Sequence, residues 1–556
     1  MTTGPKFYVT TPIYYVNDRP HIGHVYTTTI ADILARYHRL RGEDVFFLTG
    51  VDEHAAKVSD AAAERGLTPQ QWADQNAAVF QETFGRLGIT NNDFVRTSAQ
   101  SHKDRVQKYV AALLKSGDVY AGDYEGWYDA GQEEYVTESN AAASGFKSPI
   151  NGKPLIRKKE KNYFFKLESY REALLAHYKA HPEFVQPDAR RNEIENRIKE
   201  MNDVPISRTG AGGWGIPVPG DPDQTIYVWI DALFNYLSFI DTPPEVPDRR
   251  KYWISGVTHL IAKDILWFHA AIWPAMLMAL RKCAGYDWVV LPKQIYAHSF
   301  WISEGQKMSK SLGNFVDLEK IDHYVKTFSL DALRYFLASN GPLGTTDSDF
   351  AEAKFIETYN AALANSLGNC FSRVCNMINR YFQGVLPSFD EDHPQYRLVL
   401  DETWPAEGVD MRGAGVYAHL PFLASSCAEH SVIPAYNQLD LNQVSNGVRI
   451  ILKAVDSYIE KNQPFKLAKD PANLPEIGTI LYLCAESIRI ASVLLWPVMP
   501  AKCEDIWRRL GCDYAAQMAA NGGRGKLDEW TKWGQLKPGT PILQGDPLFP
   551  RFEVKK

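Results

Sequence analysis

The apolar positions near the start of the chain follow two different periods. Residues 7–11 and 45–50 are short, almost continuous apolar runs rich in β-branched and aromatic residues, which is typical of strands buried on both faces. Between them, residues 23–40 carry apolar side chains at the helical period. A strand, a helix and a strand in close succession predict a βαβ unit of a parallel sheet. Residues 54–115 are expected to be helical throughout.

The pattern of apolar and polar residues changes after about residue 120. Short β-like pieces at 125–128 and 163–167 lie among Gly, Pro and Lys, which predicts a separate inserted domain. Apolar runs return at 227–230, 252–255 and 295–297, so the second half of the parallel sheet is expected to resume near 225. Helical patterns dominate from about 347 to 518 and predict a bundle. The tail, 521–556, carries several Gly and Pro and is expected to fold back onto the body.

Composition and net charge exclude several classes of protein. The chain has 556 residues, of which 45% are hydrophobic and 23% charged, which excludes a disordered chain, a collagen-like chain and a disulfide miniprotein. The net charge of −6 argues against a protein that coats nucleic acid irrespective of sequence, but it leaves room for a local basic patch.

The cysteines and the apolar runs indicate the cellular compartment of the protein. The seven cysteines include no Cys-x-x-Cys pair, so we expect free thiols in a reducing compartment. The apolar run 270–280 is too short to span a bilayer, and the first residues do not resemble a signal peptide. A cytoplasmic protein without a membrane partner is expected.

The first candidate motif is Pro20-His21-Ile22-Gly23-His24, where the first helix should begin. A helix N-terminus presents unpaired N–H groups that bind anions such as phosphates, and Gly23 allows a nucleotide to approach the backbone. His21 and His24 share one helical face, so both can donate to phosphate oxygens. Taken alone, the pair is somewhat more typical of two ordinary histidines at a helix start.

The second candidate motif is Lys307-Met308-Ser309-Lys310-Ser311, which follows a strand-like stretch and a turn. Its lysines and serines can neutralise charge that develops on a triphosphate. It is not a P-loop, because the Gly-x-x-x-x-Gly-Lys pattern is absent. Taken alone, it is also compatible with a solvated surface turn.

Together the two motifs, with a domain inserted between the halves of a parallel sheet, resemble the class I aminoacyl-tRNA synthetases, whose signatures are His-Ile-Gly-His and Lys-Met-Ser-Lys-Ser. Further stretches are similar to the methionyl-tRNA synthetases, over nearly the whole chain. They are Thr11-Pro12-Ile13-Tyr14-Tyr15-Val16-Asn17, Gly50-Val51-Asp52-Glu53-His54, Val228-Trp229-Ile230-Asp231-Ala232, Lys263-Asp264-Ile265-Leu266-Trp267-Phe268-His269 and Trp273-Pro274-Ala275-Met276-Leu277.

The resemblance implies an α/β fold in which a Rossmann-type catalytic domain is interrupted by a connective-peptide domain and followed by an all-α anticodon-binding bundle. The expected boundaries are 1–117 and 225–296 for the two catalytic halves, 118–224 for the insertion, 297–350 for the region of the second motif, 351–520 for the bundle and 521–556 for the tail.

The resemblance also implies a two-step reaction. Methionine and ATP give methionyl-adenylate and pyrophosphate, and the methionyl group then passes to the 3′-terminal ribose of initiator and elongator tRNA(Met). Magnesium would accompany ATP. Catalysis is expected from His21, His24, Lys307 and Lys310, and the expected ATP-binding residues are His21, Gly23, His24, Asp264, Lys307, Ser309 and Lys310.

The methionine side chain is an unbranched thioether, which favours an apolar box with aromatic rings near the sulfur. By analogy with the family, Asp52 would pair with the substrate ammonium, and Tyr236 and His269 would offer weak hydrogen bonds to the sulfur. The expected methionine-binding residues are Ile13, Tyr15, Asp52, Trp229, Ala232, Leu233, Tyr236, Ile265, Phe268, His269 and Trp273. Each aromatic residue taken singly is more typical of core packing, and only their joint match to one family favours the methionine site.

Some positions depart from the family pattern. Where many relatives carry zinc knuckles, this chain has Asp129, Gln132, Ser148 and Asn151, so we expect a knuckle fold without metal and no structural zinc. Ala262 replaces the usual Gly before Lys-Asp.

The helical region resembles the anticodon-reading part of the family. Asn369 and Arg373 match its Asn-x-x-x-Arg, and Phe465 after Pro464 stands where the family has Trp and can still stack on a base. Basic stretches such as Arg157-Lys158-Lys159 and Arg190-Arg191 are candidates for tRNA contact, or solvated faces.

Three alternatives remain open at this stage. Valine, isoleucine and leucine enzymes of class I have an editing insertion for which this chain has no room, and a cysteine enzyme would need a zinc site. Nucleotidyltransferases of the superfamily are smaller and lack the helical region. A non-catalytic tRNA-binding paralogue would not require His21, His24, Lys307 and Lys310.

Because the chain ends without an added C-terminal dimerisation domain, a monomer is expected.

Overall fold

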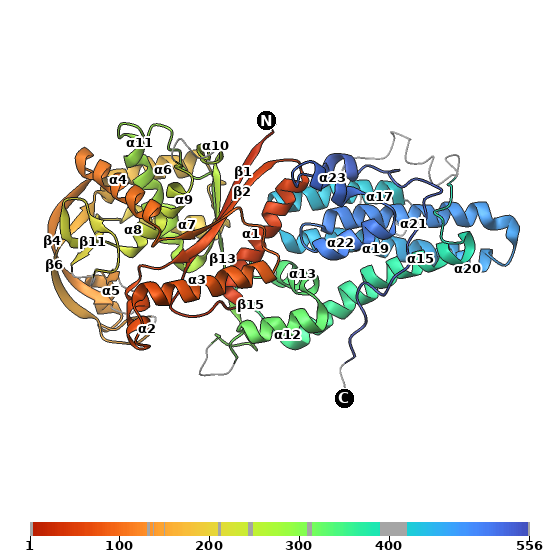
Figure 1. The fold of residues 1–556 in the computed structure, drawn as a ribbon, viewed down its shortest axis with the longest axis horizontal. Helices are drawn as coiled ribbons and strands as arrows, with labels where there is room; N and C mark the ends of the chain where they lie inside the picture. Colours follow the sequence, from red (N-terminus) through yellow and green to blue (C-terminus); the bar gives the residue numbers. More distant parts are fainter. Residues whose placement is uncertain are drawn as a thin grey trace.

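The computed structural model describes residues 4–129, 134–136, 138–149, 151–209, 213–242, 248–308, 314–389 and 420–553. The sheets and their helices form one end of an elongated molecule, and the C-terminal helices form the other (Figure 1). The fold class predicted from the sequence is confirmed: a six-stranded parallel sheet, small antiparallel sheets and a C-terminal helical region.

The central sheet places the carboxyl ends of its strands at one edge. All of its neighbouring strands pair in parallel, in the order β3-β2-β1-β12-β13-β7. Its strands are β1 (Lys6–Tyr15), β2 (Asp44–Asp52), β3 (Asp93–Arg96), β7 (Val185–Gln186), β12 (Val257–Ala262) and β13 (Gln294–His298). The strand order reverses between β1 and β12, and ligands of open parallel sheets bind beyond the carboxyl ends at such a point.

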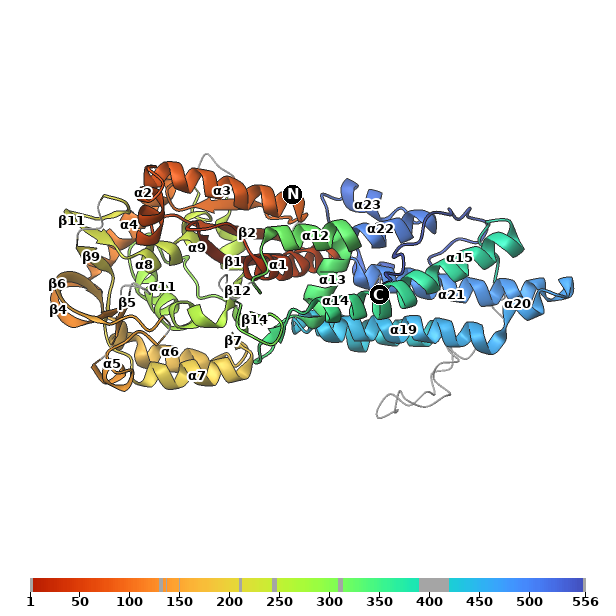
Figure 2. The ribbon, with the colours of Figure 1, turned by 90° about the horizontal axis from the view of Figure 1, so that it is seen from below.

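Helix α1 (Ile22–Leu40) follows β1, close to the predicted range. The neighbouring helices cover the sheet (Figures 1 and 2). They are α2 (Ala56–Ala63), α3 (Pro69–Arg86), α4 (Gln100–Ser116), α8 (Val228–Leu233), α9 (Asn235–Ser238), α10 (Arg250–Ile254) and α11 (Trp273–Arg281), with the short segments η2 (Lys263–Ile265) and η3 (Phe268–Ile272) before α11.

Three sequence-based expectations about this region are wrong. Residues 54–115 are not helical throughout, because strand β3 interrupts the helices. The apolar runs 227–230 and 252–255 belong mainly to helices α8 and α10, so the sheet does not resume near 225: its edge strand β7 comes earlier, at Val185–Gln186, and its next strand in the chain is β12. A short apolar run does not distinguish a buried strand from one turn of a buried helix, which is the reason for the last two errors.

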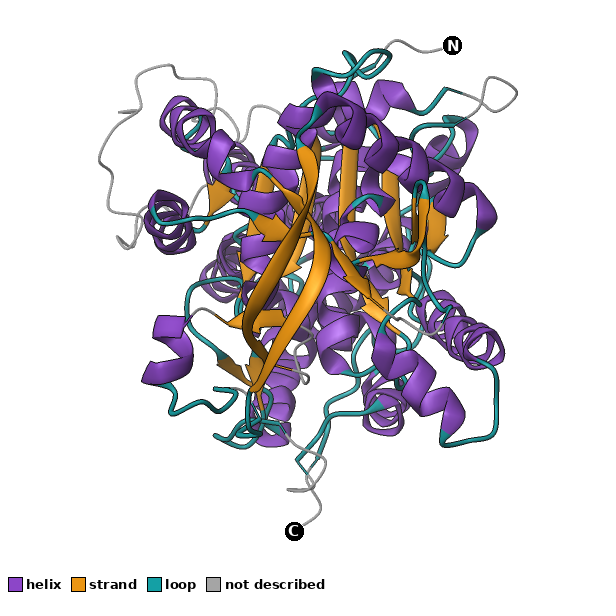
Figure 3. Ribbon diagram, turned by 90° about the vertical axis from the view of Figure 1, so that its left-hand side faces the viewer, coloured by secondary structure: helices purple, strands orange, loops and turns teal. Residues whose placement is uncertain are grey.

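The inserted region is mostly antiparallel. Seen from its end of the molecule, strands lie in front with helices around them (Figure 3). One sheet has the order β5-β4-β6-β8 and another β10-β11-β9. The strands are β4 (Val119–Asp129), β5 (Glu134–Val136), β6 (Ile156–Phe165), β8 (Val204–Pro205), β9 (Ser207–Thr209), β10 (Pro217–Val218) and β11 (Asp221–Ile226), and the helical segments are α5 (Glu138–Ala143), η1 (Leu167–Tyr170), α6 (Arg171–Ala180) and α7 (Asp188–Lys199).

The C-terminal end is helical, as predicted. Before it, β14 (Trp301–Ile302) pairs with β15 (Ser348–Asp349). The helical segments are α12 (Leu318–Phe328), α13 (Leu330–Asn340), α14 (Glu352–Thr358), η5 (Tyr359–Gly368), α15 (Asn369–Phe382), α17 (Leu420–Cys427), η8 (Ala428–Val432), α18 (Ile433–Asn437), α19 (Leu441–Asn462), α20 (Pro464–Leu467), η9 (Pro471–Asn473), α21 (Leu474–Leu495), α22 (Pro500–Arg509), α23 (Tyr514–Ala520) and α24 (Leu527–Trp530).

Helix α21 is the apolar centre of this bundle. With the preceding turn it forms a helix of 25 residues that is apolar enough to cross a membrane by length and composition, but its apolar window is completely buried inside the protein. Its length and hydropathy are therefore those of a core helix.

A buried ion pair joins α1 to the helical end. Arg334 on α13 lies 2.8 Å from the Asp32 carboxylate on α1, and it donates to the carbonyls of Val498 (2.9 Å) and Pro497 (3.0 Å). Burial by itself would raise the pKa of Asp32, but Arg36 and Arg334 lower it to about 2. The helix that begins at the first motif is thus fixed to the bundle by a charged network.

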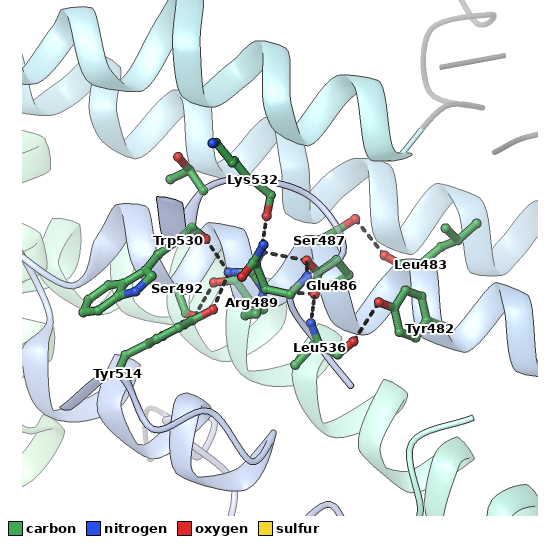
Figure 4. Close-up of polar contacts among 12 residues, drawn as sticks. Tyr482, Leu483, Glu486, Ser487, Arg489, Ser492, Tyr514, Trp530, Lys532 and Leu536 are labelled. Carbon is green, nitrogen blue, oxygen red and sulfur yellow. Dashed lines mark hydrogen bonds and ion pairs between the residues drawn. The ribbon is translucent and has the colours of Figure 1, made fainter. Parts of the chain in front are cut away.

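A second buried ion pair attaches the tail to the bundle (Figure 4). Arg489 and Glu486 on α21 are fully buried and lie 2.7 Å apart. Arg489 also donates to the Tyr514 hydroxyl and to the carbonyls of Trp530 and Lys532. Glu486 accepts from the N–H groups of residues 535 and 536 in the tail (2.8 and 3.2 Å).

Candidate active site

A cavity of about 540 Å³ lies at the carboxyl ends of β1, β2, β12 and β13, where the strand order reverses. Its volume is in the range of ordinary small-molecule sites. The start of α1 closes one side and helix α8 another. Both the first motif and most residues expected to bind methionine line this one cavity.

The first motif forms the N-terminus of α1. His21 is the N-cap, and its Nδ1 accepts a hydrogen bond from the Gly23 N–H at 3.1 Å, while His24 Nδ1 accepts from the His21 N–H at 3.2 Å. A Cβ on residue 23 would lie 2.9 Å from the His21 ring, so glycine is needed for this cap as well as for approach of a ligand. His21, Gly23 and His24 all line the cavity.

The capping hydrogen bonds define which ring nitrogens can donate to a ligand. A ring nitrogen that accepts a hydrogen bond carries no proton, so the proton of each imidazole is on Nε2. Desolvation of the ring and the neighbouring His21 hold the pKa of His24 well below its usual value. At neutral pH, His24 therefore presents a neutral N–H donor.

The stem of the second motif is fixed near the first. The Asn314 side chain donates to the carbonyls of Ser303 and Lys307, both at 3.2 Å, and the Ile22 N–H donates to the Val316 carbonyl at 3.0 Å. Phe315 packs on His21 with a ring separation of 5.1 Å. Lys307 is exposed and does not line the cavity, and the expected ATP-binding residues Ser309 and Lys310 lie outside the described residues.

Most of the expected methionine-binding residues meet in the cavity. The side chains come from β1, β2, α8, α9 and the segments after β12. The cavity is lined by Ile13, Tyr15, Asp52, Trp229, Ala232, Leu233, Tyr236, Ile265 and His269, and by the expected nucleotide ligand Asp264 and by Ala262. Asp52 is 3% exposed and ends β2 beside the apolar walls.

Two expected members do not line the cavity. Phe268 stacks on Trp229 with a ring separation of 4.1 Å and so supports the wall from behind. Trp273 is fully buried, 6.1 Å from the Tyr236 ring, and its indole N–H donates to His259 at 3.3 Å. Both contact residues of the cavity wall and do not line the cavity themselves.

The two polar groups expected near the sulfur interact with each other. His269 Nδ1 lies 3.0 Å from the Ile265 carbonyl, which can only accept, so the ring proton is on Nδ1. The Tyr236 hydroxyl then donates to His269 Nε2 at 2.9 Å. Burial lowers the pKa of His269 to about 4, which keeps the ring neutral.

Sequence reasoning missed a buried network behind the cavity wall. The Asp231 carboxylate on α8 accepts from His54 Nδ1 at 2.6 Å and from His102 Nε2 at 2.7 Å. Burial alone would raise the pKa of Asp231, but the two histidines lower it to about 2. The network connects the segment after Asp52 to the helix of Trp229 and Ala232. The only sequence signal was the presence of polar residues inside apolar surroundings.

The former knuckle positions form a hydrogen-bonded turn. The Gly152 N–H donates to the Ser148 carbonyl at 2.9 Å, and the Ser148 N–H donates to the Lys153 carbonyl at 2.8 Å. Asp129 and Ser148 are buried, and Gln132 lies outside the described residues. In the described part of the chain, no group of three or more His, Cys, Asp or Glu residues is placed to bind a metal.

The residues expected to read the anticodon lie far along the bundle. Asn369 is exposed at the start of α15, and Arg373, one turn later, pairs with Glu460 at 2.6 Å. Phe465 on α20 is 42% exposed and follows the end of α19, on which Glu460 lies. The helices that carry these residues, α15 and α20, lie in the helical half of the molecule, away from the sheets (Figure 2), and α15 packs on α19.

Comparisons with known proteins point to one family. The family model described as "tRNA synthetases class I (M)" matches residues 7–145 and 144–375. The methionine–tRNA ligase of Halalkalibacterium halodurans is 38% identical over 99% of this chain and 79% of its own length. The corresponding enzyme of Streptomyces coelicolor is also 38% identical, over 99% of this chain and 97% of its own.

A solved structure matches the whole fold. It is a Mycobacterium tuberculosis methionyl-tRNA synthetase in complex with methionyl-adenylate, which is 34% identical to this chain. The TM-score is 0.84, and the match covers 98% of this chain and 100% of that one.

Proposed function

The chain belongs to the class I methionyl-tRNA synthetases and is an ATP-dependent methionine–tRNA ligase, and we propose that the cavity described above is where it forms and uses methionyl-adenylate. One observation supports this assignment most strongly: a helix N-terminus with two histidine donors, and an apolar, aromatic-rich wall beside Asp52, line the same cavity. The M. tuberculosis relative of the same fold binds methionyl-adenylate.

In the activation step, a methionine carboxylate oxygen attacks the α-phosphorus of ATP. The bond to the bridging oxygen breaks, and pyrophosphate leaves. His21 and His24 donate Nε2–H to the phosphate oxygens, where negative charge increases in the transition state. Lys307 and Lys310 add positive charge from the second motif, and Ser309 a hydroxyl donor. Asp264, which faces the cavity beyond β12, accepts from the ribose hydroxyls.

The amino acid is held by shape and by one charge. Asp52 pairs with the substrate ammonium, and rings such as Tyr15 and Trp229 enclose the thioether. The Tyr236 hydroxyl donates to His269, and His269 donates to the Ile265 carbonyl. Because both protons are used in this way, the two side chains present a fixed, polarisable surface to the sulfur. Ile13, Ala232, Leu233 and Ile265 complete the contact, while Phe268 and Trp273 support it from behind.

In the transfer step, a hydroxyl oxygen of the 3′-terminal ribose of tRNA(Met) attacks the methionyl carbonyl carbon. AMP leaves, and the hydroxyl proton passes to solvent or to the phosphate. Asn369, Arg373 and Phe465 would bind the anticodon of both initiator and elongator tRNA by base-edge hydrogen bonds and stacking. We retain the domain boundaries expected from the sequence, a cytoplasmic location and a monomer as parts of this proposal.

Methionine-dependent exchange of pyrophosphate into ATP tests the assignment directly. Among the twenty amino acids, methionine alone is expected to support exchange. Exchange with another amino acid would keep the class I chemistry and contradict the pocket assignment. No exchange from folded protein that still binds tRNA would favour a non-catalytic paralogue.

Removal of metal ions tests two proposals separately: that magnesium accompanies ATP, and that the protein needs no structural zinc. Magnesium needs few protein ligands, because the nucleotide phosphates supply oxygens. Asp129, Ser148 and Asn151 lack the thiolate and imidazole donors of structural zinc. Exchange activity lost on chelation is therefore expected to return fully with Mg²⁺ alone. A further requirement for Zn²⁺, or a fall in the melting temperature on chelation, would contradict the proposal.

The Asp231→Asn substitution is expected to raise the KM for methionine about 10-fold, with a much smaller change in the KM for ATP. The amide places its NH2 group against one of the two histidine N–H groups, so α8 is expected to shift relative to Asp52, and a misplacement of about 1 Å at a binding site is costly. Exchange kinetics measure both constants.

The control for Asp231→Asn is His38→Asn, which breaks another His–carboxylate pair, the one with Glu43 at 2.8 Å, away from the cavity. Its two KM values are expected to stay at the wild-type level. Equal increases of both KM values in Asp231→Asn would indicate general destabilisation rather than positioning of the methionine site.

A further inference from the structure

Phe300 differs from the other large apolar side chains of the described residues that are exposed. Its side chain is 39% exposed, and it is the member of that group that also lines the cavity. It lies between β13 and β14, outside the sets proposed for methionine and ATP. An exposed ring at the entrance of a substrate cavity gains most when a ligand covers it.

Phe300 is held together with a cation. Its backbone N–H donates to Asp347 Oδ1 at 2.8 Å, and Lys263 pairs with the same carboxylate oxygen at 2.6 Å. The Lys263 Nζ lies over the Phe300 ring, 4.8 Å from its centroid. One carboxylate thus fixes an aromatic ring and an ammonium group side by side, and Lys263 directly precedes the proposed ribose ligand Asp264.

A second cation lies close by. Arg190 on α7 donates to the Thr345 carbonyl at 3.3 Å, two residues before Asp347, and also pairs with Glu193 at 2.9 Å. Arg190 belongs to the basic stretch Arg190-Arg191, which is a candidate for tRNA contact on sequence grounds. The entrance therefore combines an exposed aromatic ring with two basic side chains, each paired with a carboxylate that a phosphate can replace as partner; aromatic rings beside basic side chains are how proteins bind single-stranded nucleic acid.

We infer that Phe300, with Lys263 over its ring, is the stacking platform for the single-stranded 3′ end of tRNA as it enters the cavity. This inference rests on the proposed function. The residues proposed above contact methionine and the phosphates and ribose of ATP, and Phe300 is not among them. The tRNA end is the remaining substrate that is single-stranded and carries unstacked bases, and the KM for ATP in the exchange assay below distinguishes it from adenine of ATP as the base that covers the ring. Stacking would bring the terminal ribose hydroxyl toward the methionyl carbonyl, and Lys263 would neutralise a nearby phosphate.

The test compares the two half-reactions in Phe300→Ala. Exchange of pyrophosphate into ATP is expected to keep the wild-type kcat and both KM values. Single-turnover transfer from preformed methionyl-adenylate to tRNA(Met) is expected to fall about 10-fold or more at subsaturating tRNA, because stacking of one base on an aromatic ring has an effect of this size. Phe300→Trp is expected to restore transfer. Ile254→Ala, which truncates an exposed apolar residue outside the cavity, is the control.

Binding of tRNA lacking its terminal adenosine provides the second readout. Wild-type protein is expected to bind intact tRNA(Met) more tightly than the shortened form, and Phe300→Ala is expected to bind both alike. Normal transfer by Phe300→Ala, an increased KM for ATP in the exchange assay, or equal binding of both tRNAs by wild type would each overturn the inference. Failure of the proposed function would be recognised separately, as wild-type protein without methionine-dependent exchange.

Discussion

The His24→Ala variant is expected to form methionyl-adenylate about 100- to 1,000-fold more slowly than the wild-type enzyme, with little change in the KM for methionine. Loss of a single donor that contacts charge in the transition state has effects of this size. His24 lines the cavity, and its Nε2 carries the proton because Nδ1 accepts from the His21 N–H. Pre-steady-state measurement of adenylate formation at saturating ATP checks the rate.

His24→Asn is the matched variant for this experiment. Its side-chain oxygen can still accept from the His21 N–H, and its amide can still donate toward the phosphates, so we expect it to retain more activity than the alanine variant. A rate for His24→Ala within a few-fold of wild type would contradict the assignment of His24 as a catalytic donor.

The pKa of His24 gives this prediction a pH dependence. Desolvation holds the pKa of His24 well below its usual value, so the neutral form is the native form above that pKa. Acidification from pH 8 to 6.5 is therefore not expected to change the rate through His24. A rise in the rate over that interval that is lost in His24→Asn would show that imidazolium is the active form.

The parts of the site that the sequence predicted are those whose chemistry is local. The first motif caps its own helix, so His21, Gly23 and His24 had to lie together at one N-terminus once a helix began at residue 22. Asp52 ends a buried strand, which places it at the carboxyl edge of a parallel sheet. Local pattern and sheet direction were sufficient for these residues.

The missed features depend on contacts between distant segments. Residues 54, 102 and 231 come from three elements, and nothing in their local sequence indicates that two histidines share one carboxylate. Trp273 differs from Trp229 only in the layer that it occupies, since both lie in apolar helical segments. Strand β3 has four residues and polar ends, so only its pairing with β2 makes it a strand.

Replacing Arg489 by methionine is expected to lower the free energy of unfolding of the helical end by about 3–5 kcal/mol, because removing one partner of a buried ion pair leaves the other charge without compensation. All five N–H groups of Arg489 have acceptors: two on Glu486, and one each on the Tyr514 hydroxyl and the Trp530 and Lys532 carbonyls. Methionine fills similar space but supplies none of these hydrogen bonds.

Arg508→Met on the neighbouring helix α22 is the control, since Arg508 is 59% exposed and pairs with Asp505 at 2.5 Å; its expected cost is below about 0.5 kcal/mol. The double variant Glu486→Gln/Arg489→Met removes the stranded charge and keeps an oxygen for one of the two N–H groups of residues 535 and 536, which donate to different oxygens of Glu486, so it should be more stable than Arg489→Met alone. Urea unfolding and protease cleavage of the tail measure both effects. A double variant no more stable than the single one would show that the lost hydrogen bonds to the tail, rather than the uncompensated carboxylate, account for the destabilisation.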